Sequence, residues 1–293
     1  MKTIALLAIL FVSYSSWGKV SFKWLGISGF VLDDGVTTLV FDPAMTRAPL
    51  YDYLPFRAVQ SDEAEVFYWM NRCGIKSVQA TFVNHAHFDH VIDAPMVVKK
   101  FGGVLYGSSS VINVGLGQGL AAKQVQKIKD NDGWKIGNFT VRIFDTPHAP
   151  HIMDIMLMDG NIEKPLKSPT SIWNYRVGDT FSFLITHPSG RIIFQSTGRV
   201  MDEDKLKSVT ADVLLLTIAN RHTSENLIQQ RIIPSKARKL IPLHHDNFFY
   251  KMNRDKEIDY LWGVKVNEFN KALENAKSLK PIWPKYCEEV HIL

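Results

Sequence analysis

The stretch ATFVNHAHFDH, residues 80–90, joins an apolar segment to four potential metal ligands. Side chains two residues apart on an extended chain share a face, so His85 and His87 can bind one cation together. If the chain then turns into a helix, Asp89 and His90 can point at a second position. Imidazole nitrogens and a carboxylate, with no thiolate, suit a catalytic zinc site better than a structural one. The stretch therefore predicts a metal site at the end of a strand, where rigid scaffolds often present chemistry.

The bulk composition limits the class of protein without naming a partner. The chain has 293 residues and is 46% hydrophobic, which is enough for one large core or two fused half-domains. Its formal net charge of +5 comes from basic residues that are spread along the chain. Such a distribution indicates a mildly basic solvated surface and argues against a nucleic-acid partner.

The first eighteen residues have the pattern of a secretory signal peptide. Lys2 gives a positive start, residues 4–14 are an apolar run, and Ser16-Trp17-Gly18 places small residues at the −3 and −1 positions. The run is shorter than the ~20 apolar residues that cross a bilayer, so we expect no transmembrane anchor after cleavage. The pattern predicts a mature domain of residues 19–293 that is secreted or periplasmic.

The sequence contains two cysteines, Cys73 and Cys287. In an exported protein they can form one disulfide that joins distant parts of the chain. Two unpaired thiols are the alternative, and the spacing does not decide between them.

Apolar and alternating stretches along the chain predict the secondary structure. The predicted strands are residues 20–26, 29–32, 38–41, 80–83, 104–106, 139–144, 181–186, 191–194, 212–216 and 240–243. The predicted helices are residues 61–73, 92–101, 119–129, 224–238 and 264–276, with residues 115–119 as a loop before the third. Residues 43–60 and 153–179 are expected to be loops that contribute to a pocket. This order, in two halves of similar size, predicts a sandwich of two mixed sheets with helices on the outer faces.

The pattern His85-x-His87-x-Asp89-His90 after an apolar strand resembles the defining motif of the metallo-β-lactamase superfamily. Gly26, the strands around it and Asp42-Pro43 resemble the N-terminal sheet of that family. The resemblance covers essentially the whole mature chain. It implies an α/β (α+β) fold, a four-layer αββα sandwich with the site at one edge between the sheets. It also implies three further ligands: a histidine after a later strand, a bridging aspartate and a histidine near the C-terminus.

The candidate for the first of these ligands is His148, just past the predicted strand 139–144. His151 is a rival three residues further on. We favour His148 because it is closer to the rigid end of the strand. His151 would then be a residue behind the ligands or at the entrance of the site.

The candidate near the C-terminus is His244, directly after the predicted strand 240–243. His245 would point to the opposite side if the strand continues, so only one of the two should reach the metal. Asp246 could orient a ligand imidazole or cap a helix. The stretch LHHDNFF, residues 243–249, resembles the branch that includes ascorbate-lactone hydrolases and the phospholipase-D-like enzymes acting on N-acyl ethanolamine phospholipids.

Ser196 stands where the resemblance places the bridging aspartate. A neutral hydroxyl is a poor zinc ligand, which leaves three outcomes: a weaker second site, a single-metal enzyme, or a water-bridged pair held by Asp89, His90 and His244. We expect two zinc ions, because a subclass of secreted β-lactamases also resembles a two-zinc site with serine there. Fewer carboxylates leave more positive charge, which favours an anionic small-molecule substrate.

These observations together predict a zinc-dependent hydrolase in which a metal-bound hydroxide cleaves an ester, lactone or phosphodiester bond. Zinc lowers the pKa of its water to roughly 7, and Asp89 can bind the metal and orient the nucleophile. One alternative is a secreted class B β-lactamase, which export and Ser196 favour. The other is a non-catalytic metal-binding protein on the same fold, against which the retention of all six candidate ligands argues.

Overall fold

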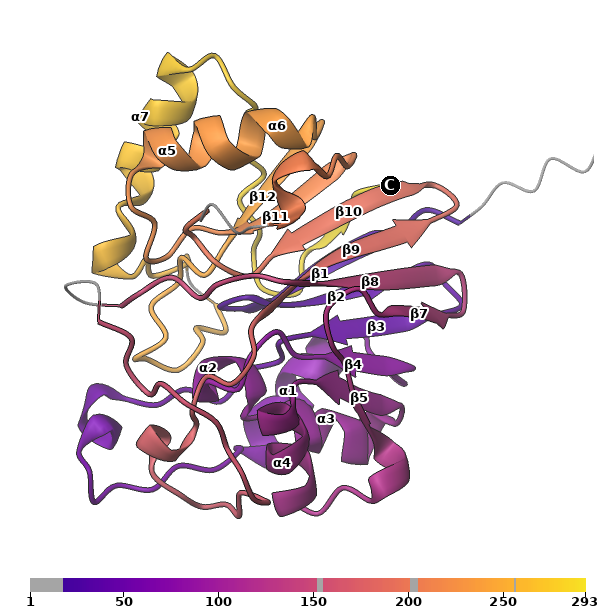
Figure 1. Ribbon diagram of the computed structural model, residues 1–293, viewed down its shortest axis with the longest axis vertical. Helices are drawn as coiled ribbons and strands as arrows, with labels where there is room; N and C mark the ends of the chain where they lie inside the picture. The colour runs from indigo at the N-terminus through magenta and orange to yellow at the C-terminus, as the bar shows by residue number, and fades with distance from the viewer. Residues whose placement is uncertain (1–17, 152–154, 201–204, 256) are drawn as a thin grey trace, which may run out of the picture.

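In the computed structural model, residues 18–151, 155–200, 205–255 and 257–293 are described. They form two β-sheets that pack face to face (Figure 1). The seven-stranded sheet has the order β13-β1-β2-β3-β4-β5-β6, and the six-stranded sheet has the order β12-β11-β10-β9-β8-β7. The predicted sandwich of two mixed sheets is confirmed. The predicted signal peptide, apart from Gly18, lies outside the described residues.

The strands of the first sheet are β1 Ser21–Gly26, β2 Gly29–Asp33, β3 Thr38–Phe41, β4 Ala80–Phe82, β5 Val104–Gly107, β6 Val125–Lys127 and β13 Glu289–His291. Those of the second are β7 Gly133–Ile136, β8 Phe139–Asp145, β9 Phe181–His187, β10 Gly190–Gln195, β11 Val213–Thr217 and β12 Lys239–Leu243. The strands β3 to β6 are parallel, and so are β10 to β12. Because parallel strands end at the same edge of a sheet, the loops after β3 and β4 lie together at one end of the first sheet. The loop after β12 joins the β1–β2 turn through the bond from the His244 backbone N–H to Ile27 O at 2.8 Å.

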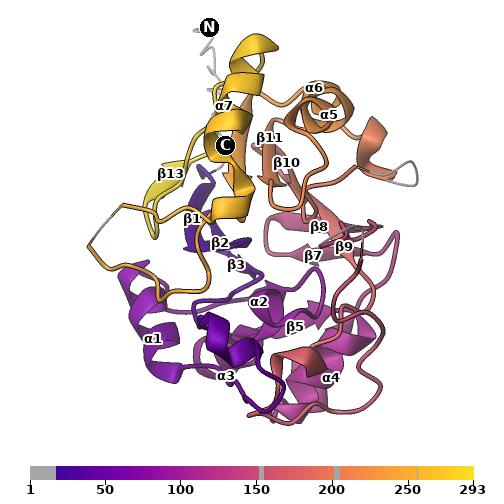
Figure 2. The same cartoon turned by 90° about the vertical axis from the view of Figure 1, so that its left-hand side faces the viewer.

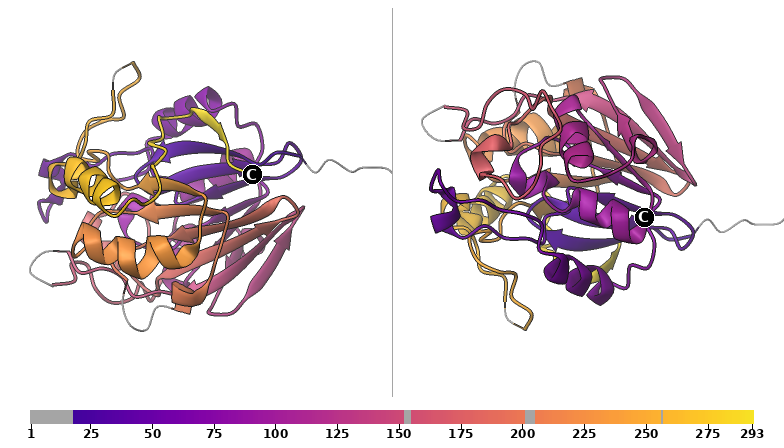
Figure 3. Two further views of the ribbon diagram at one scale, coloured as in Figure 1. Left: turned by 90° about the horizontal axis from the view of Figure 1, so that it is seen from above. Right: turned by 90° about the horizontal axis from the view of Figure 1, so that it is seen from below.

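Helices cover the outer face of each sheet, which completes the four-layer arrangement (Figures 1 and 3). The first sheet is covered by α1 Glu63–Arg72, α2 Phe88–Val91, α3 Ala94–Phe101 and α4 Ser109–Gly117. The second is covered by α5 Ser224–Leu227, a π-helical turn Ile228–Ile232, α6 Ile233–Ser235 and α7 Val266–Asn275. Short 3-10 turns include η1 Leu50–Tyr53, η3 Ile172–Asn174 and η6 Trp262–Val264. No helix among the described residues is long and apolar enough to cross a membrane.

Phenylalanines fill the space between the sheets. Phe41 of β3 contacts the rings of Phe82, Phe183 and Phe194, with centroids 5.3 to 6.0 Å away. All four side chains are buried. Each buried aromatic side chain of this size stabilises the fold by roughly 1.5–3 kcal/mol relative to an exposed one. This rigid layer lies directly beneath the strand ends from which the histidine loops emerge.

The predicted helix over residues 119–129 is wrong. Residues 122–124 form one 3-10 turn and Val125–Lys127 is a strand that pairs with β5. The helix lies earlier, as α4, and contains glycines that the sequence analysis assigned to a loop. Ser108 begins it by accepting a hydrogen bond from the backbone N–H of Val111 at 3.4 Å. A Cβ on Gly117 would lie 2.2 Å from the backbone of Leu166, so close packing explains this glycine inside a helix.

Cys73 and Cys287 form a disulfide across 214 residues of sequence. It joins the end of α1 to the segment that leads into β13. Of the two alternatives left open by the sequence, the structure has the disulfide. The strands β6, β7 and β13 were not predicted, and all three are short strands.

Candidate metal centre

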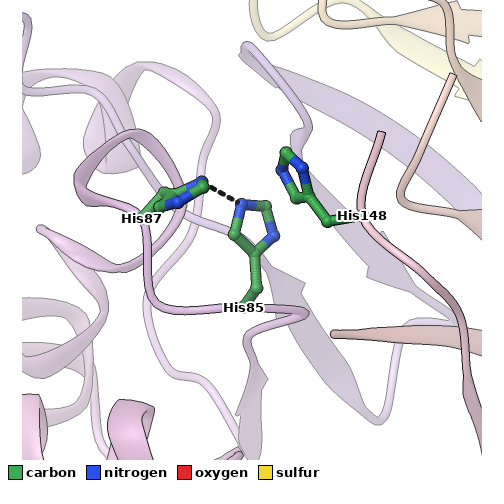
Figure 4. Close-up of side chains that lie close together, drawn as sticks. All are labelled: His85, His87 and His148. Atoms are coloured by element: carbon green, nitrogen blue, oxygen red, sulfur yellow. Dashed lines mark hydrogen bonds between the residues drawn. The ribbon is translucent and has the colours of Figure 1, made fainter. Parts of the chain in front are cut away.

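Three loops at one end of the sandwich carry the predicted metal ligands. His85 and His87 lie between β4 and α2, and His87 is the residue that precedes the first turn of α2. His148 follows β8 and approaches this pair from the other side (Figure 4). Asp89 and His90 belong to α2, and His244 directly follows β12.

The side chains of His85, His87 and His148 converge as one group. Each offers a nitrogen that lies within 4.8 Å of the other two. His85 Nε2 lies 3.0 Å from His87 Nδ1 (Figure 4). Two nitrogens of a tetrahedral zinc site lie about 3.3 Å apart when the Zn–N bonds are about 2.05 Å. The pair is thus close to the spacing that a shared cation requires.

A second group is made of Asp89, His90 and His244. Their ligand atoms also lie within 4.8 Å of one another. Asp89 Oδ2 is 3.3 Å from His244 Nε2 and 3.7 Å from His90 Nε2. The structure therefore brings all six sequence-predicted ligands together, in two groups of three, although they come from three separate parts of the chain.

Hydrogen bonds behind the rings determine which nitrogen of each histidine faces the centre. His90 Nδ1 donates to Asp42 Oδ2 at 3.0 Å, and His148 Nδ1 donates to the backbone oxygen of Ala149 at 2.6 Å. His85 Nδ1 contacts the side-chain oxygen of Asn84 in the same way. With Nδ1 carrying the proton, Nε2 of all three rings keeps its lone pair for a metal.

Asp42 is a site residue whose role the sequence analysis missed. Its Oδ1 accepts the backbone N–H of Asn84 at 2.8 Å, and its Oδ2 accepts both the Asn84 amide and His90 Nδ1. It is fully buried at the end of β3, next to β4 in the parallel part of the sheet. The available signal was its position: a carboxylate at the carboxyl end of a strand that neighbours the histidine strand.

The buried surroundings keep the first group neutral. Burial and the neighbouring imidazoles hold the pKa of His85 and His148 well below the usual value. Burial lowers the pKa of His87 to about 3. Burial alone would raise the pKa of Asp89, but His90 and His244 outweigh it, so the pKa of this carboxyl lies below its usual range. Neutral imidazoles and an ionised carboxylate are the forms that bind metal.

The donor set fits a pair of divalent cations. In each group the ligand atoms lie within 4.8 Å of one another, with His87 Nδ1 beside His85 Nε2 and His244 Nε2 beside Asp89 Oδ2. The Nδ1 protons of His85, His90 and His148 are directed away from the centre, so few protons remain to satisfy the nitrogens that face it, and unpaired buried polar atoms are costly. One group supplies three nitrogens, and the other supplies two nitrogens and a carboxylate oxygen, which are the donors that zinc accepts in catalytic sites.

His151 lies beside this centre, and Ser196 precedes Thr197, whose Oγ1 accepts the backbone N–H of Ala149 in the His148 loop. The His151 ring centroid is 5.0 Å from that of His148 and 5.3 Å from that of His87, and its Nδ1 accepts the backbone N–H of Leu157. Ser196 Oγ donates to the backbone oxygen of Phe181 at 2.6 Å. Each side chain is therefore engaged with neighbouring backbone.

His245 and Asp246 point away from the two donor groups. The His245 ring stacks on Trp24 at 4.6 Å. Asp246 has neither of the two roles that the sequence suggested. It accepts hydrogen bonds from Arg47 Nη2 at 2.8 Å, from the Tyr286 hydroxyl at 2.9 Å and from the backbone N–H of Ile27 at 2.9 Å. Its bond to Ile27 holds the turn between β1 and β2, and its second oxygen is paired with the buried guanidinium of Arg47.

Comparison with known proteins gives the fold a name. No family model matches the sequence. A UPF0173 metal-dependent hydrolase of Myxococcus xanthus is 24% identical over 135 residues, which cover 45% of this chain and 40% of that protein. The match thus spans well under half of that relative's length.

Solved structures match over nearly the whole chain. Igni18, a metallo hydrolase from the archaeon Ignicoccus hospitalis, is 16% identical with a TM-score of 0.58, covering 93% of this chain and 97% of its own. A possible metal-dependent hydrolase from Veillonella parvula is 13% identical with a TM-score of 0.59, and the match covers 94% of this chain and 100% of that one. The metallo-β-lactamase fold protein YhfI from Bacillus subtilis is 13% identical with a TM-score of 0.54, and the match covers 92% of this chain and 99% of that one. The chain therefore has the metallo-β-lactamase fold.

Proposed function

We propose that this chain is a metal-dependent hydrolase that holds two zinc ions and cleaves an ester, lactone or phosphodiester bond. The observation that carries the proposal is the convergence of six donor residues, five of them buried and His148 partly buried, in two adjacent groups. Zinc bound there would act as a Lewis acid and lower the pKa of a coordinated water to roughly 7. The relatives named as metal-dependent hydrolases support the same reaction class.

The protein's own part in the reaction is to hold these donors still and to keep water from competing with them. Asp42 fixes the ring of His90, and Thr197 Oγ1 fixes the loop of His148 by accepting the backbone N–H of Ala149 at 3.1 Å. Asp89, on the rigid first turn of α2, faces His244 and can orient a nucleophile through its second oxygen. Preorganised donors of this kind contribute to catalysis without reorganisation during the reaction.

An anionic substrate fits the cleft beside the centre. A cleft of about 420 Å³ is lined by His151 and by three cationic side chains, Arg199, Arg221 and Lys265, together with the carboxylate of Glu268. Arg221 is bonded to the backbone oxygens of Ile218, Val264 and Lys265. A wall of net positive charge raises the local concentration of anions. We propose that the charged part of the substrate enters here.

A hydrolysis panel tests the reaction class. Nitrocefin, acyl homoserine lactones and bis-p-nitrophenyl phosphate would be assayed with zinc-loaded protein, with chelator-treated protein and with Asp89→Asn. We expect turnover of a lactone or the phosphodiester that chelation abolishes and zinc restores. Turnover of nitrocefin alone would assign a β-lactamase. No metal-dependent turnover of any substrate would favour a non-catalytic protein.

We propose in addition that the protein is exported. The Cys73–Cys287 disulfide supports this, because such bonds form and persist in oxidising compartments. Fractionation of cells that express the whole chain would place the protein outside the cytoplasm, and mass spectrometry would find a mature chain that begins at Lys19. A full-length chain retained in the cytoplasm would contradict export.

A further inference from the structure

Exposed apolar side chains gather around the metal centre. Of the large hydrophobic side chains that are exposed in the described residues, most lie in three loops: residues 49–56, residues 172–174 and residues 247–263. Trp262 is 95% exposed, Leu50 is 68% exposed and Tyr250 is 66% exposed. Figure 2 shows η1 and the loop between β12 and α7 at the same end of the molecule as α2. Exposed apolar patches of this kind mark binding surfaces.

The first and last of these loops form the two walls of a groove of about 650 Å³. We call it the apolar groove; its walls are Pro49, Leu50 and Tyr51 on one side and Phe249, Tyr250 and Trp262 on the other. Lys251 is the one charged side chain that lines it among the described residues. Its volume falls within the range of roughly 300–1,000 Å³ that small-molecule sites occupy.

Hydrogen bonds hold the walls in place independently of these apolar side chains. The backbone N–H of Asn247 donates to Asp259 O at 2.7 Å, and that of Leu261 donates to His245 O at 2.9 Å. On the other wall, the backbone N–H of Asp52 donates to Pro49 O at 2.8 Å. The side chains of Leu50, Tyr250 and Trp262 take part in none of these bonds, so their exposed apolar surface is available to a ligand.

Aromatic contacts link the walls of the apolar groove to the metal centre. Phe248 packs edge to face against His244 at 5.5 Å and lies 4.7 Å from Phe249 of the groove wall. Tyr53 contacts Phe249 at 5.5 Å and Phe88, the residue between His87 and Asp89, at 5.7 Å. One layer of rings thus lies between the groove and the donor cluster, and Gly263 lines both the groove and the cleft that contains His151, so the two hollows meet beside the centre.

We propose that the apolar groove binds the alkyl or acyl chain of a single substrate molecule, whose reacting group lies at the metal centre. The inference rests on the proposed function and narrows its substrate class to molecules that combine a polar scissile group with an apolar arm. A docked chain would cover Leu50, Tyr250 and Trp262 and replace their contact with water. A groove favours a single chain over a lipid surface. A lipid surface would also contact exposed residues outside the groove, such as Phe56, which is 81% exposed.

The test is a chain-length series measured by isothermal titration calorimetry. Ethyl, hexyl and decyl phosphate, each below its critical micelle concentration, would be titrated into zinc-loaded and metal-free protein. We expect affinity to rise about two- to fourfold per methylene, because each buried methylene contributes in proportion to its area. In the double variant Leu50→Ser and Trp262→Ser, decyl phosphate should bind at least about tenfold more weakly while ethyl phosphate is unaffected. Both side chains are exposed, so the variant should fold.

Phe56→Ser is the matched control, because Phe56 belongs to the same loop as Leu50 but does not line the groove. It should leave the whole series unchanged. Equal affinity for hexyl and decyl phosphate, or an unchanged series in the double variant, would overturn the inference. Binding to phosphatidylcholine vesicles that Phe56→Ser abolishes, without binding of monomeric decyl phosphate, would also overturn it. None of the proposed metal ligands lines the apolar groove. The rise of affinity with chain length should therefore persist in metal-free protein even if the hydrolase proposal fails, so the two failures can be told apart.

Discussion

Asp42 Oδ2 lies 3.0 Å from His90 Nδ1, and the same carboxylate binds the side-chain amide of Asn84, whose oxygen contacts His85 Nδ1. One buried carboxylate therefore orients an imidazole in each of the two donor groups. Carboxylate partners of this kind set the tautomer of ligand histidines and increase their basicity. The coupling of the two groups through Asp42 has consequences that can be measured.

Asp42→Asn should weaken zinc binding at both positions, by about 10- to 100-fold, because neither His90 nor Asn84 would keep a charged acceptor. Competition against a fluorescent zinc chelator measures both affinities. Glu63→Gln, at an exposed carboxylate of α1, serves as the control and should bind zinc as the wild type does. Weakening of one position alone would show that Asp42 does not serve both groups.

Ser196→Asp should strengthen the second zinc position by at least about tenfold, because a carboxylate would replace a neutral hydroxyl where the family resemblance places the bridging aspartate. In the wild type this hydroxyl is bonded to the Phe181 backbone oxygen. Zinc titration of both proteins, with bound ions counted, provides the measurement. Identical stoichiometry and affinity would refute a bridging role for this position.

Asp246→Ala should destabilise the protein by about 3–5 kcal/mol, because it leaves the buried guanidinium of Arg47 without its partner. The substitution should also lower the zinc affinity of the group that contains His244. Asp246 holds Ile27, and Ile27 O accepts the backbone N–H of His244 at 2.8 Å. Urea unfolding measures the stability. The double variant Arg47→Met and Asp246→Leu should recover much of the loss, whereas additive losses would argue against the pairing.

Cys73→Ser should lower the free energy of unfolding by about 2–5 kcal/mol, because the disulfide closes a loop of more than two hundred residues in the unfolded chain. Urea unfolding with and without reductant measures it. Reductant should destabilise the wild type to the level of the variant and leave the variant unchanged. An equal midpoint for oxidised wild type and variant would contradict the prediction.

Strand patterns predicted the sandwich and the 85–90 cluster predicted part of the site, because both are local signals, whereas His148 and His244 were identified through the family resemblance. The role of Asp42 could not be predicted from the sequence, because it depends on β3 and β4 being parallel neighbours. The pairing of Asp246 with Arg47 likewise joins residues 199 positions apart. Helix α4 was missed because glycine disfavours helices by about 1 kcal/mol, and the contact of Gly117 with Leu166 overrides that preference. The apolar groove, too, depends on loops that meet only in the folded chain.

The central claim is that two adjacent groups of donors each hold a metal ion. Inductively coupled plasma mass spectrometry of purified protein, saturated with zinc and freed of excess, tests it most directly. We predict two zinc ions per chain in the wild type and about one in each of His148→Ala and His244→Ala, because each variant removes one ligand from a different group. Two ions retained in both variants, or none bound by the wild type, would contradict the account.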